Sequence, residues 1–268
     1  MNILLVAINA KYIHSNLAVY SLRAYAREYQ EHICLLEYTI NHRVDYILQE
    51  IYKKQPDVLC FSCYIWNFRY VQELVEEFHK LMPEVPIWVG GPEVSYETGT
   101  FLADYPMVKG AMVGEGEATF LDLCRHYGDG VLLEQMHGIV FRDAQGSLVH
   151  TMPGEPLSMD ALPFCYEHLK DFENRIIYYE TSRGCPFSCS YCLSSIEKGW
   201  RFRSRELVEE ELNYFLAHKV AQVKFVDRTF NCNHEHAMFI WNYLKEHDNG
   251  VTNFHFEITA DLLTEKEL

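Results

Sequence analysis

Residues 1–130 alternate short apolar runs with longer amphipathic segments, and this alternation restricts the fold more than any other feature of the sequence. The apolar runs predict strands at Asn2–Ile8, Ile33–Tyr38, Val58–Cys63, Ile87–Val89 and Met107–Val113. Apolar residues recur at helical spacing in Leu17–Tyr29, Val44–Lys54, Tyr70–Leu81 and Ala118–Tyr127. Strands that alternate with helices form parallel sheets, so we expect a doubly wound α/β domain here.

In such a sheet, a ligand binds beyond the carboxyl ends of the strands. The loops at that edge are expected at residues 9–16, 64–67, 90–95 and 114–117. None of them carries the Gly-x-Gly-x-x-Gly spacing that cradles a dinucleotide. The domain is therefore expected to bind a different ligand.

The chain continues with a hairpin and a linker, expected over residues 131–174, and a second domain, expected over 175–268. Strands of this second domain are predicted at Ile176–Thr181, Gln222–Asp227 and Phe254–Thr259, and helices at Glu206–Ala217 and His234–Glu246. This pattern is the beginning of a β/α barrel. Only three strands fit, and residues 263–268 look like the start of a helix, so we expect a chain truncated within the barrel.

Three cysteines, Cys185, Cys189 and Cys192, lie in one short segment with no fourth beside them. A four-iron cluster held by three thiolates keeps one iron open to exchangeable ligands. A structural zinc ion would need a fourth ligand such as Cys232 or His234, and neither has a finger-like spacing to the triplet. A disulfide framework is disfavoured because the nine cysteines are an odd number and no signal peptide precedes them, so a reducing, cytoplasmic location is expected.

The three-then-two spacing of these cysteines, with Gly184 and Pro186 around the first and Tyr191 before the third, resembles the radical S-adenosylmethionine (SAM) enzymes. The resemblance implies a [4Fe-4S] cluster on the three cysteines, SAM at the open iron, and Tyr191 near the adenine. It also implies that Asp227, at the end of the second barrel strand, holds the methionine part of SAM. Because such enzymes cleave SAM reductively, an external electron donor of the flavodoxin or ferredoxin type is expected.

A series of short signatures ahead of the cysteines resembles the cobalamin (B12)-binding domains that precede radical SAM cores. The series is Gly90-Gly91-Pro92, Val113–Glu117, Thr119-Phe120, Gly138–Arg142 and Leu162-Pro163. The resemblance implies cobalamin over the carboxyl edge of the first sheet, in contact with Ser62, Gly90, Gly91, Gly114, Glu115 and Gly116. Glycines would let the corrin approach the backbone, although a turn can also demand glycine for its φ angle alone.

His14 is the residue of the first loop that could contact cobalt. Domains that replace the lower axial base carry Asp-x-His-x-x-Gly, whereas Tyr12 and Leu17 occupy the aspartate and glycine positions here. Without the carboxylate, the imidazole lacks the partner that would orient it toward a metal. We therefore expect His14 to be a surface or loop-capping residue rather than a cobalt ligand.

Cys60 and Cys63 end a predicted strand and are expected in the core, because neither opens a helix that would lower its pKa. The basic run of Arg201, Arg203 and Arg205 fits a solvated face, or contacts to phosphate and carboxylate groups.

The last predicted strand raises two further expectations. Its open edge should leave Phe254 and Phe256 exposed. Glu257 should either contact a ligand or face outwards, because an unpaired carboxylate in a core is costly.

The formal net charge of −15 disfavours binding to a nucleic-acid backbone. No apolar run is long enough to span a membrane. A small-molecule or peptide substrate is expected.

Taken together, the motifs favour a cobalamin-dependent radical SAM enzyme that transfers a methyl group to an unactivated centre. One alternative is a radical SAM enzyme that catalyses a rearrangement or uses no cobalamin. Another is a non-enzymatic iron–sulfur redox or sensor protein, which the missing fourth thiolate disfavours.

Overall fold

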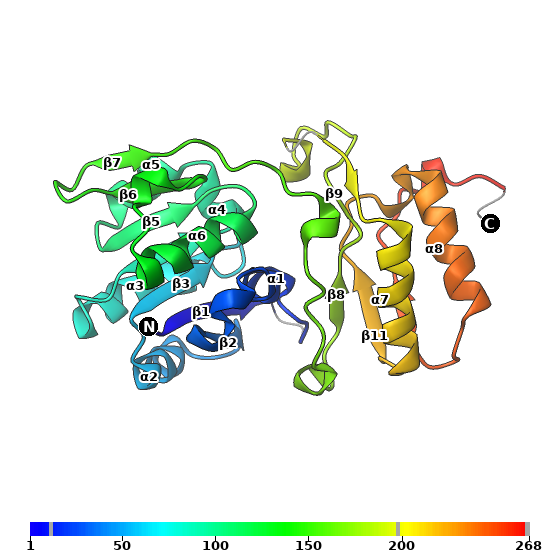
Figure 1. The fold of residues 1–268 in the computed structure, drawn as a ribbon, viewed down its shortest axis with the longest axis horizontal. Helices are drawn as coiled ribbons and strands as arrows, with labels where there is room; N and C mark the ends of the chain where they lie inside the picture. Colours follow the sequence, from blue (N-terminus) through cyan, green and yellow to red (C-terminus); the bar gives the residue numbers. More distant parts are fainter. Residues whose placement is uncertain (11–12, 197–198, 266–268) are drawn as a thin grey trace. The chain divides into compact units, whose positions relative to one another are not determined.

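The structure, a computed structural model, describes residues 1–10, 13–196 and 199–265. The chain divides into two compact units, Met1–Pro156 and Leu157–Leu268, each with its own main sheet (Figure 1).

The first unit is built on a seven-stranded sheet in the order β2-β1-β3-β4-β5-β6-β7. The strands are β1 (Ile3–Asn9), β2 (Ile33–Thr39), β3 (Val58–Ser62), β4 (Ile87–Gly90), β5 (Val108–Met112), β6 (Ile139–Arg142) and β7 (Leu148–His150). Strands β1 to β5 pair in parallel, whereas β6 and β7 extend the β5 edge in antiparallel fashion.

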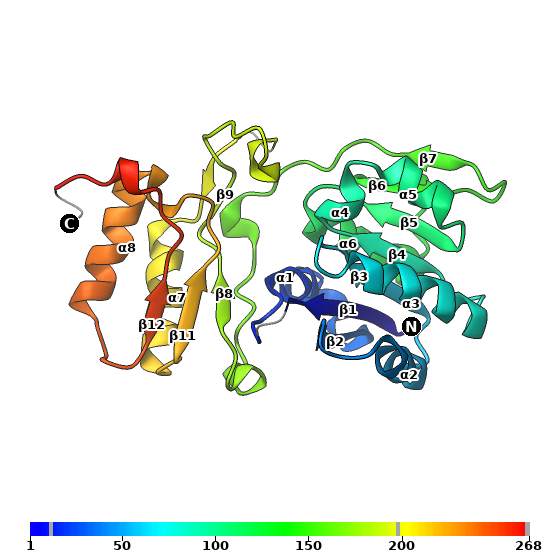
Figure 2. The same cartoon turned by 180° about the vertical axis from the view of Figure 1, so that it is seen from behind.

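Helices cover both faces of this sheet (Figures 1 and 2). They are α1 (Leu17–Tyr25), α2 (Val44–Lys54), α3 (Phe68–Leu81), α4 (Pro92–Ser95), α5 (Thr98–Asp104) and α6 (Gly116–Asp129). Alternate residues of β1 enter two cores: Leu4 and Val6 pack with α2 and α3, and Ile3 and Leu5 with α1 and α6. Burial on both faces explains the nearly continuous apolar runs and confirms the doubly wound α/β fold.

The second unit holds a three-stranded parallel sheet in the order β12-β11-β8. Its strands are β8 (Ile177–Tyr179), β11 (Gln222–Phe225) and β12 (Asn253–His255), and its helices are α7 (Arg205–Ala217) and α8 (His234–Glu246). A separate antiparallel pair is formed by β9 (Ser182–Arg183) and β10 (Arg201–Phe202). Three parallel strands that alternate with helices confirm the predicted first half of a β/α barrel.

Short 3₁₀ turns complete the described structure. They lie at Arg27–His32, Leu133–Gln135, Met159–Ala161, Leu169–Phe172, Leu193–Ser195, Phe230–Cys232 and Ala260–Leu262. The first of them replaces the end of the helix predicted over Leu17–Tyr29.

Segment 157–172, part of the predicted linker, packs within the second unit. The Tyr166 side chain is 1% exposed. Arg203 Nη1 donates hydrogen bonds to the carbonyl oxygens of Met159 and Leu162, at 2.5 and 2.9 Å. The prolines correctly indicated irregular backbone, but that backbone is fixed because a buried guanidinium satisfies its carbonyl groups.

The last strand differs from the prediction in two ways. It ends at His255, and residues 263–265 form no helix, while residues 266–268 lie outside the described part of the chain. Phe254 and Phe256 are half-buried rather than exposed. The Phe256 ring lies 4.5 Å from the rings of both Phe225 and Phe230, measured between centroids, so aromatic packing covers this edge of the core.

Candidate cofactor-binding sites

The carboxyl edge of the first sheet aligns the predicted cobalamin contacts. The register pairs Ser62 at the end of β3 with Gly90 at the end of β4, and Gly90 with Met112 at the end of β5. Gly114 lies two residues after the end of β5, and Gly116 opens α6. Residues that are 54 positions apart in the sequence therefore share one edge.

Ser62 and Gly90 suit a bulky ligand with polar groups. The Ser62 Oγ atom is buried and has no hydrogen-bond partner among the described residues. A hydroxyl in that state is costly, so a ligand that offers it a hydrogen bond would gain affinity. A Cβ atom at Gly90 would lie 3.4 Å from Met112 Cε, which is ordinary contact, so internal packing does not demand glycine there.

Gly91 has a different explanation. Its φ angle is 110°, and a Cβ atom would lie 2.5 Å from the Cys63 carbonyl oxygen. Only glycine tolerates both conditions. The close approach of the loops after β3 and β4 thus accounts for this glycine without a ligand.

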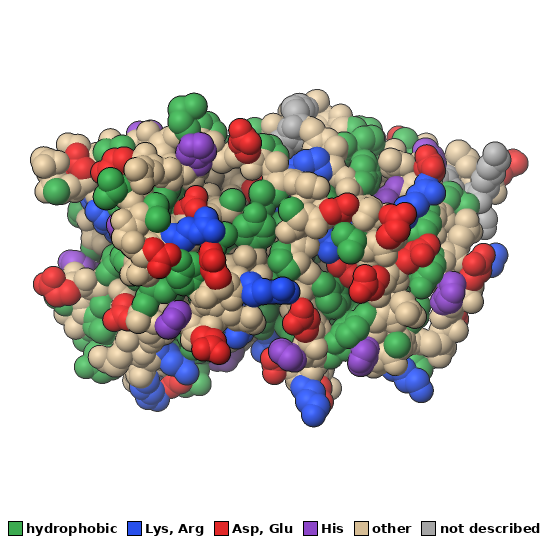
Figure 3. Space-filling model, viewed as in Figure 1, with side chains coloured by type: hydrophobic (Ala, Val, Ile, Leu, Met, Phe, Trp, Pro, Cys, Tyr) green, Lys and Arg blue, Asp and Glu red, His purple; other side chains and the backbone are tan. Residues whose placement is uncertain are grey.

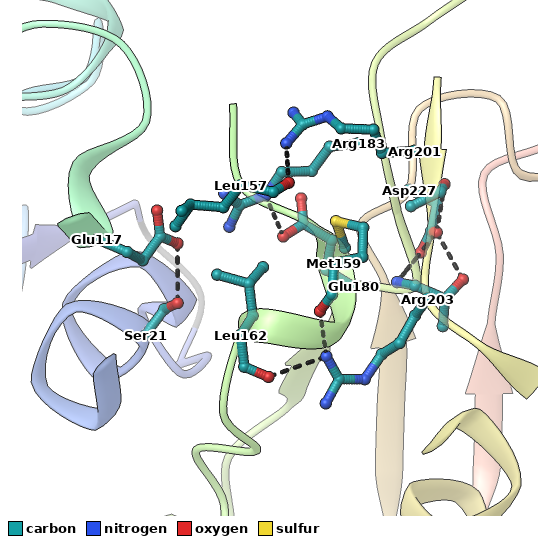
Figure 4. A network of polar contacts seen from close by, with 12 residues as sticks. Ser21, Glu117, Leu157, Met159, Leu162, Glu180, Arg183, Arg201, Arg203 and Asp227 are labelled. Atoms are coloured by element: carbon teal, nitrogen blue, oxygen red, sulfur yellow. Dashed lines mark hydrogen bonds and ion pairs between the residues drawn. The ribbon is translucent and has the colours of Figure 1, made fainter. Parts of the chain in front are cut away.

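Loop 114–117 is held against α1. A Cβ atom at Gly116 would lie 3.0 Å from Leu22 Cδ2. Glu117 is 4% exposed and accepts a hydrogen bond of 2.9 Å from Ser21 Oγ (Figure 4). Gly114 is exposed and has open space around it, and Glu115 is half-buried as the residue that caps α6. The helix start is therefore fixed while the preceding loop faces outwards.

His14 is buried, at 7% exposure, so the expected surface position is wrong. Its Nδ1 atom lies 2.9 Å from the Ser15 carbonyl oxygen. Because a carbonyl oxygen only accepts, Nδ1 is the donor in this contact. The ring is thus tied to its own loop, as the loop-capping interpretation requires. Tyr12, whose identity entered that interpretation, lies outside the described residues.

A buried amide network fixes the ends of β1, β2 and β3 and escaped sequence reasoning. Asn67 Nδ2 donates to the carbonyl oxygens of Ile8 and Ser62, at 3.0 and 2.9 Å. Asn9 Nδ2 donates to Glu37 Oε1 at 3.0 Å. Amide residues directly after apolar runs were the available signal, because strand ends are where side chains complete the backbone hydrogen bonding.

Cys60 and Cys63 belong to the core, as predicted. Both are almost fully buried. Burial raises the pKa of the Cys63 thiol to about 12 and that of Cys60 further. All nine cysteines are free, so no disulfide framework is present.

The three clustered cysteines lie in the loop between β9 and β10. This loop closes at Gly184, which is buried, has a φ angle of 94°, and packs against the Gly199 backbone. A Cβ atom at Gly184 would collide with the Gly199 carbonyl oxygen. Glycine is therefore required at position 184, where the backbones of Gly184 and Gly199 approach each other. We call this close approach the neck of the loop.

Within the loop, Cys185 and Cys192 are half-buried and Cys189 is exposed. Hydrogen bonds from Ser194 lower the pKa of Cys192, which favours the thiolate that a metal requires. Over the described ranges, no three His, Cys, Asp or Glu side chains converge closely enough to hold a metal ion. Cluster binding would therefore require the cysteine side chains to turn toward one another. Tyr191 is 91% exposed.

Asp227 is 1% exposed at the end of β11. Its Oδ1 atom accepts hydrogen bonds from Thr181 Oγ1 at 2.7 Å and from Ser182 Oγ at 2.6 Å. Both carboxylate oxygens lie within 3.2 Å of the Thr181 backbone nitrogen. Burial raises the pKa of Asp227, and these hydrogen bonds oppose the rise. The contact of Asp227 with SAM remains a prediction.

The basic run divides between buried and exposed partners. Arg203 is buried and forms a two-pronged ion pair with Glu211, with Nη2 2.5 Å from Oε1 (Figure 4 shows Arg203). Arg201 donates to the Leu157 carbonyl oxygen, and Arg205 pairs with Glu235. The carboxylate interpretation is thus correct for Arg203 and Arg205, with partners from the same unit.

Glu257 faces outwards, the second of its two expected positions. It is exposed and lies 2.8 Å from Lys224 Nζ. On the face drawn in Figure 3, Lys and Arg side chains are scattered among acidic side chains, and the described residues of that face form no basic patch. No helix in the described part of the chain is long and apolar enough to cross a membrane.

Residues 3–124 match the family model of the B12 binding domain. The chain thus combines a segment that matches the B12 binding domain with a β/α unit that carries a three-cysteine loop.

Several curated relatives are named as methyltransferases. The chain is 31% identical over 198 residues to a 2-(S-pantetheinyl)-carbapenam-3-carboxylate methyltransferase of Streptantibioticus cattleyicolor, covering 65% of this chain and 28% of the relative. It is 29% identical over 192 residues to the cobalamin-dependent radical SAM methyltransferase TokK of Streptomyces tokunonensis, covering 66% and 28%. The chain thus spans less than a third of the length of these two relatives.

Solved structures share the fold of both units. The cobalamin-dependent SAM radical enzyme OxsB, with aqua-cobalamin and SAM bound, matches with a TM-score of 0.78 and 19% identity over 100% of this chain and 40% of its own. The radical SAM methyltransferase TsrM of Kitasatospora setae matches with a TM-score of 0.66 and 19% identity, over 91% and 50%. The chain therefore has the fold of cobalamin-dependent radical SAM enzymes and resembles them in sequence.

Proposed function

We propose that this chain acts in a cobalamin-dependent radical SAM enzyme that transfers a methyl group to a small-molecule substrate. The observation that carries the proposal is the union of two features in one chain: a B12-binding match over residues 3–124, and the loop with Cys185, Cys189 and Cys192 beyond the carboxyl end of β8. The methyltransferase names of the relatives support methyl transfer. An electron donor of the flavodoxin or ferredoxin type would complete the system.

In this proposal, the carboxyl edge of the first sheet binds cobalamin, which supplies a cobalt centre able to carry a methyl group. Ser62 Oγ would donate a hydrogen bond to the cofactor and would then no longer be a buried hydroxyl without a partner. Gly90 leaves the strand end bare, and the outward loop at Gly114 contacts the cofactor beside it. Gly91 contributes indirectly, because it lets the two neighbouring loops approach each other.

The cysteine loop holds the second cofactor. Its three thiolates would hold a [4Fe-4S] cluster, and that cluster would supply the electron for reductive cleavage of SAM. The neck at Gly184 fixes where the loop leaves the sheet, and the serine hydrogen bonds favour the ionised form of Cys192. Tyr191 is exposed and could stack on an adenine ring.

A rearrangement without methyl transfer is the second candidate. A 4'-phospho-dehydrooxetanocin synthase of Priestia megaterium is 24% identical over 213 residues, covering 75% of this chain and 28% of the relative, and it is not named as a methyltransferase. Isotope labelling separates the candidates. SAM with a labelled methyl group would transfer the label to product in the first case and keep it in methionine in the second.

Equilibrium dialysis of the whole chain with cobalamin tests the cobalamin site. We expect binding of one cobalamin per chain, and Gly90→Leu should weaken it at least about tenfold, because the new side chain projects from the bare strand end. Gly99→Leu is the matched control, since open space surrounds Gly99 in α5. Equal affinity in both variants, or no binding to the unmodified chain, would refute the site.

A further inference from the structure

Three elements converge on the residues that lead into the cysteine loop. Thr181 and Ser182 follow β8 and precede Gly184 by only a few positions. Asp227 reaches them from the end of β11, and His236 reaches them from the first turn of α8. Thr181, Ser182, Asp227 and His236 are all buried. We call these four side chains the root cluster.

The hydrogen bonds of the root cluster have a defined direction. An ionised carboxylate only accepts, so the hydroxyl of Thr181 donates its single proton to Asp227 Oδ1 at 2.7 Å. The same hydroxyl lies 2.9 Å from His236 Nε2, so the imidazole must donate there. Burial, with a smaller contribution from Arg205, lowers the pKa of His236 to about 4, so the ring is neutral near neutral pH. The order is His236 to Thr181 to Asp227.

The root cluster is also linked to the cysteine loop itself. The Thr181 carbonyl oxygen accepts a hydrogen bond of 2.8 Å from the Arg203 backbone nitrogen, which lies just beyond β10. Thr229, two residues after Asp227, places its Oγ1 atom 4.0 Å from Cys185 Sγ. A shift of Asp227 would therefore displace Thr181, which precedes Cys185 in the chain, and Thr229, which lies against the Cys185 side chain.

The carboxylate oxygens of Asp227 accept hydrogen bonds from other residues of this chain. Backbone and hydroxyl donors of Thr181 and Ser182 approach the carboxylate, and only 1% of the residue is exposed. A carboxylate at the carboxyl end of a barrel strand usually faces a ligand, but this one is satisfied from within.

We propose that Asp227 and His236 are positioning residues, which act through Thr181 to fix the start of the cysteine loop before any cofactor binds. We call the hydrogen bonds from His236 to Thr181 and from Thr181 to Asp227 the lock. The proposed effect of the lock on cluster binding rests on the proposed cluster site, whereas the lock itself is a property of the chain without cofactors. The two can therefore be tested separately.

Hydrogen exchange of the whole chain without cofactors, read by mass spectrometry, tests the lock. Thr181→Val removes the central hydroxyl and keeps the shape, and Thr181→Ser restores it. His236→Leu removes the Nε2 donor, and His236→Gln retains an amide donor. We expect the Val and Leu variants to speed exchange of the amides of residues 181–185 and 203 by roughly tenfold or more, because a buried partner is left unsatisfied. The Ser and Gln variants should exchange within about threefold of the unmodified chain.

Asp261→Asn is the control, because Asp261 is exposed in the last 3₁₀ turn and should leave exchange unchanged. If Thr181→Val and His236→Leu exchange like this control at residues 181–185, the positioning role is wrong. The same holds if exchange rises equally throughout α7 and α8, because that result would mean a general loss of stability.

Iron retention after anaerobic reconstitution connects the lock to the cysteines. Thr181→Val should release iron to a chelator several-fold faster than Thr181→Ser. If the unmodified chain binds no iron, the proposed cluster site fails, while the exchange result still decides the lock. If iron binds and both variants release it at the rate of the unmodified chain, the lock has no role at the cluster.

Discussion

Single glycines set tight backbone constraints in both units. Gly184 combines a positive φ angle of 94° with contact to the Gly199 backbone, so its need for glycine is steric as well as conformational. Gly146, in the turn between β6 and β7, has a φ angle of 82° but open space around it. A comparison of Gly184 with Gly146 therefore separates the free-energy cost of a positive φ angle from the cost of steric overlap.

Gly184→Ala should destabilise the second unit by roughly 2–4 kcal/mol, because the new methyl group must displace a backbone carbonyl at the loop neck. Gly146→Ala should cost only about 1 kcal/mol. Denaturant unfolding followed by circular dichroism measures both. Equal losses in the two variants would show that the Gly199 contact is unimportant.

His236 predicts an acid-sensitive stability. Its pKa is lowered to about 4 in the folded chain, mainly by burial and also by Arg205, against an ordinary value near 6.5. Between these values the unfolded chain binds a proton that the folded chain does not, so stability falls as pH drops through this window. The loss approaches but does not exceed about 1.4 kcal/mol per pH unit.

The measurement compares the unmodified chain with His236→Gln at pH 7 and pH 5. Glutamine keeps a donor for Thr181 and does not titrate, while Asp227 titrates in both chains. The unmodified chain should lose about 1–2 kcal/mol more than the variant on acidification. Parallel losses in both chains would show that His236 does not titrate differently on unfolding.

At the scale of elements, a buried ion pair joins β10 to α7 and to the preceding segment. Arg203 binds Glu211 through two nitrogens, and Glu211 also accepts a hydrogen bond of 2.6 Å from Tyr179. Burial raises the pKa of Glu211, and Arg203 and Tyr179 oppose this rise. These contacts hold segment 157–172, the strand pair and the helix together.

Glu211→Leu should cost about 3–5 kcal/mol, because it leaves the Arg203 guanidinium buried without its counter-charge. The double variant Arg203→Met with Glu211→Leu should recover part of that loss, since no buried charge remains. A double-mutant cycle by chemical denaturation measures the difference. Additive losses would indicate that the two side chains are not coupled.

The elements also show which parts of the fold the sequence could predict. Strands β1 to β5 and the longer helices follow local periodicity, and their predicted bounds lie within a few residues of the observed ones. The pair β9 and β10 has two residues in each strand and no period to detect. The sequence allowed Arg203 to be a solvent-exposed residue, because the burial of Arg203 depends on its ion pair with Glu211. Only the fold brings these two side chains together.

The candidate sites divide in the same way. The cysteine triplet and the edge glycines are local motifs and were visible in the sequence. The contact of His236 with Thr181 spans 55 positions, and the orphaned hydroxyl of Ser62 depends on the neighbouring strands, so neither had a local signal.

At the scale of the whole molecule, the first unit extends past the boundary expected at residue 130. Strand β6 pairs with β5, and β7 pairs with β6, so a fragment that ends at residue 130 would expose the β5 edge. We expect fragment 1–156 to unfold cooperatively and remain monomeric, whereas fragment 1–130 should aggregate. Size-exclusion chromatography with thermal unfolding distinguishes them, and equal behaviour would show that the hairpin is dispensable.

Anaerobic reconstitution of the whole chain with iron, sulfide and cobalamin, followed by metal analysis, tests the central claim that one chain binds both cofactors. The account predicts about four iron, about four sulfide and about one cobalt per chain. The variant with alanine at Cys185, Cys189 and Cys192 should lose the iron and sulfide and keep the cobalt, because the proposed cobalamin contacts lie on a separate sheet. Stoichiometric iron in that variant, or no cobalt in the unmodified chain, would contradict the account.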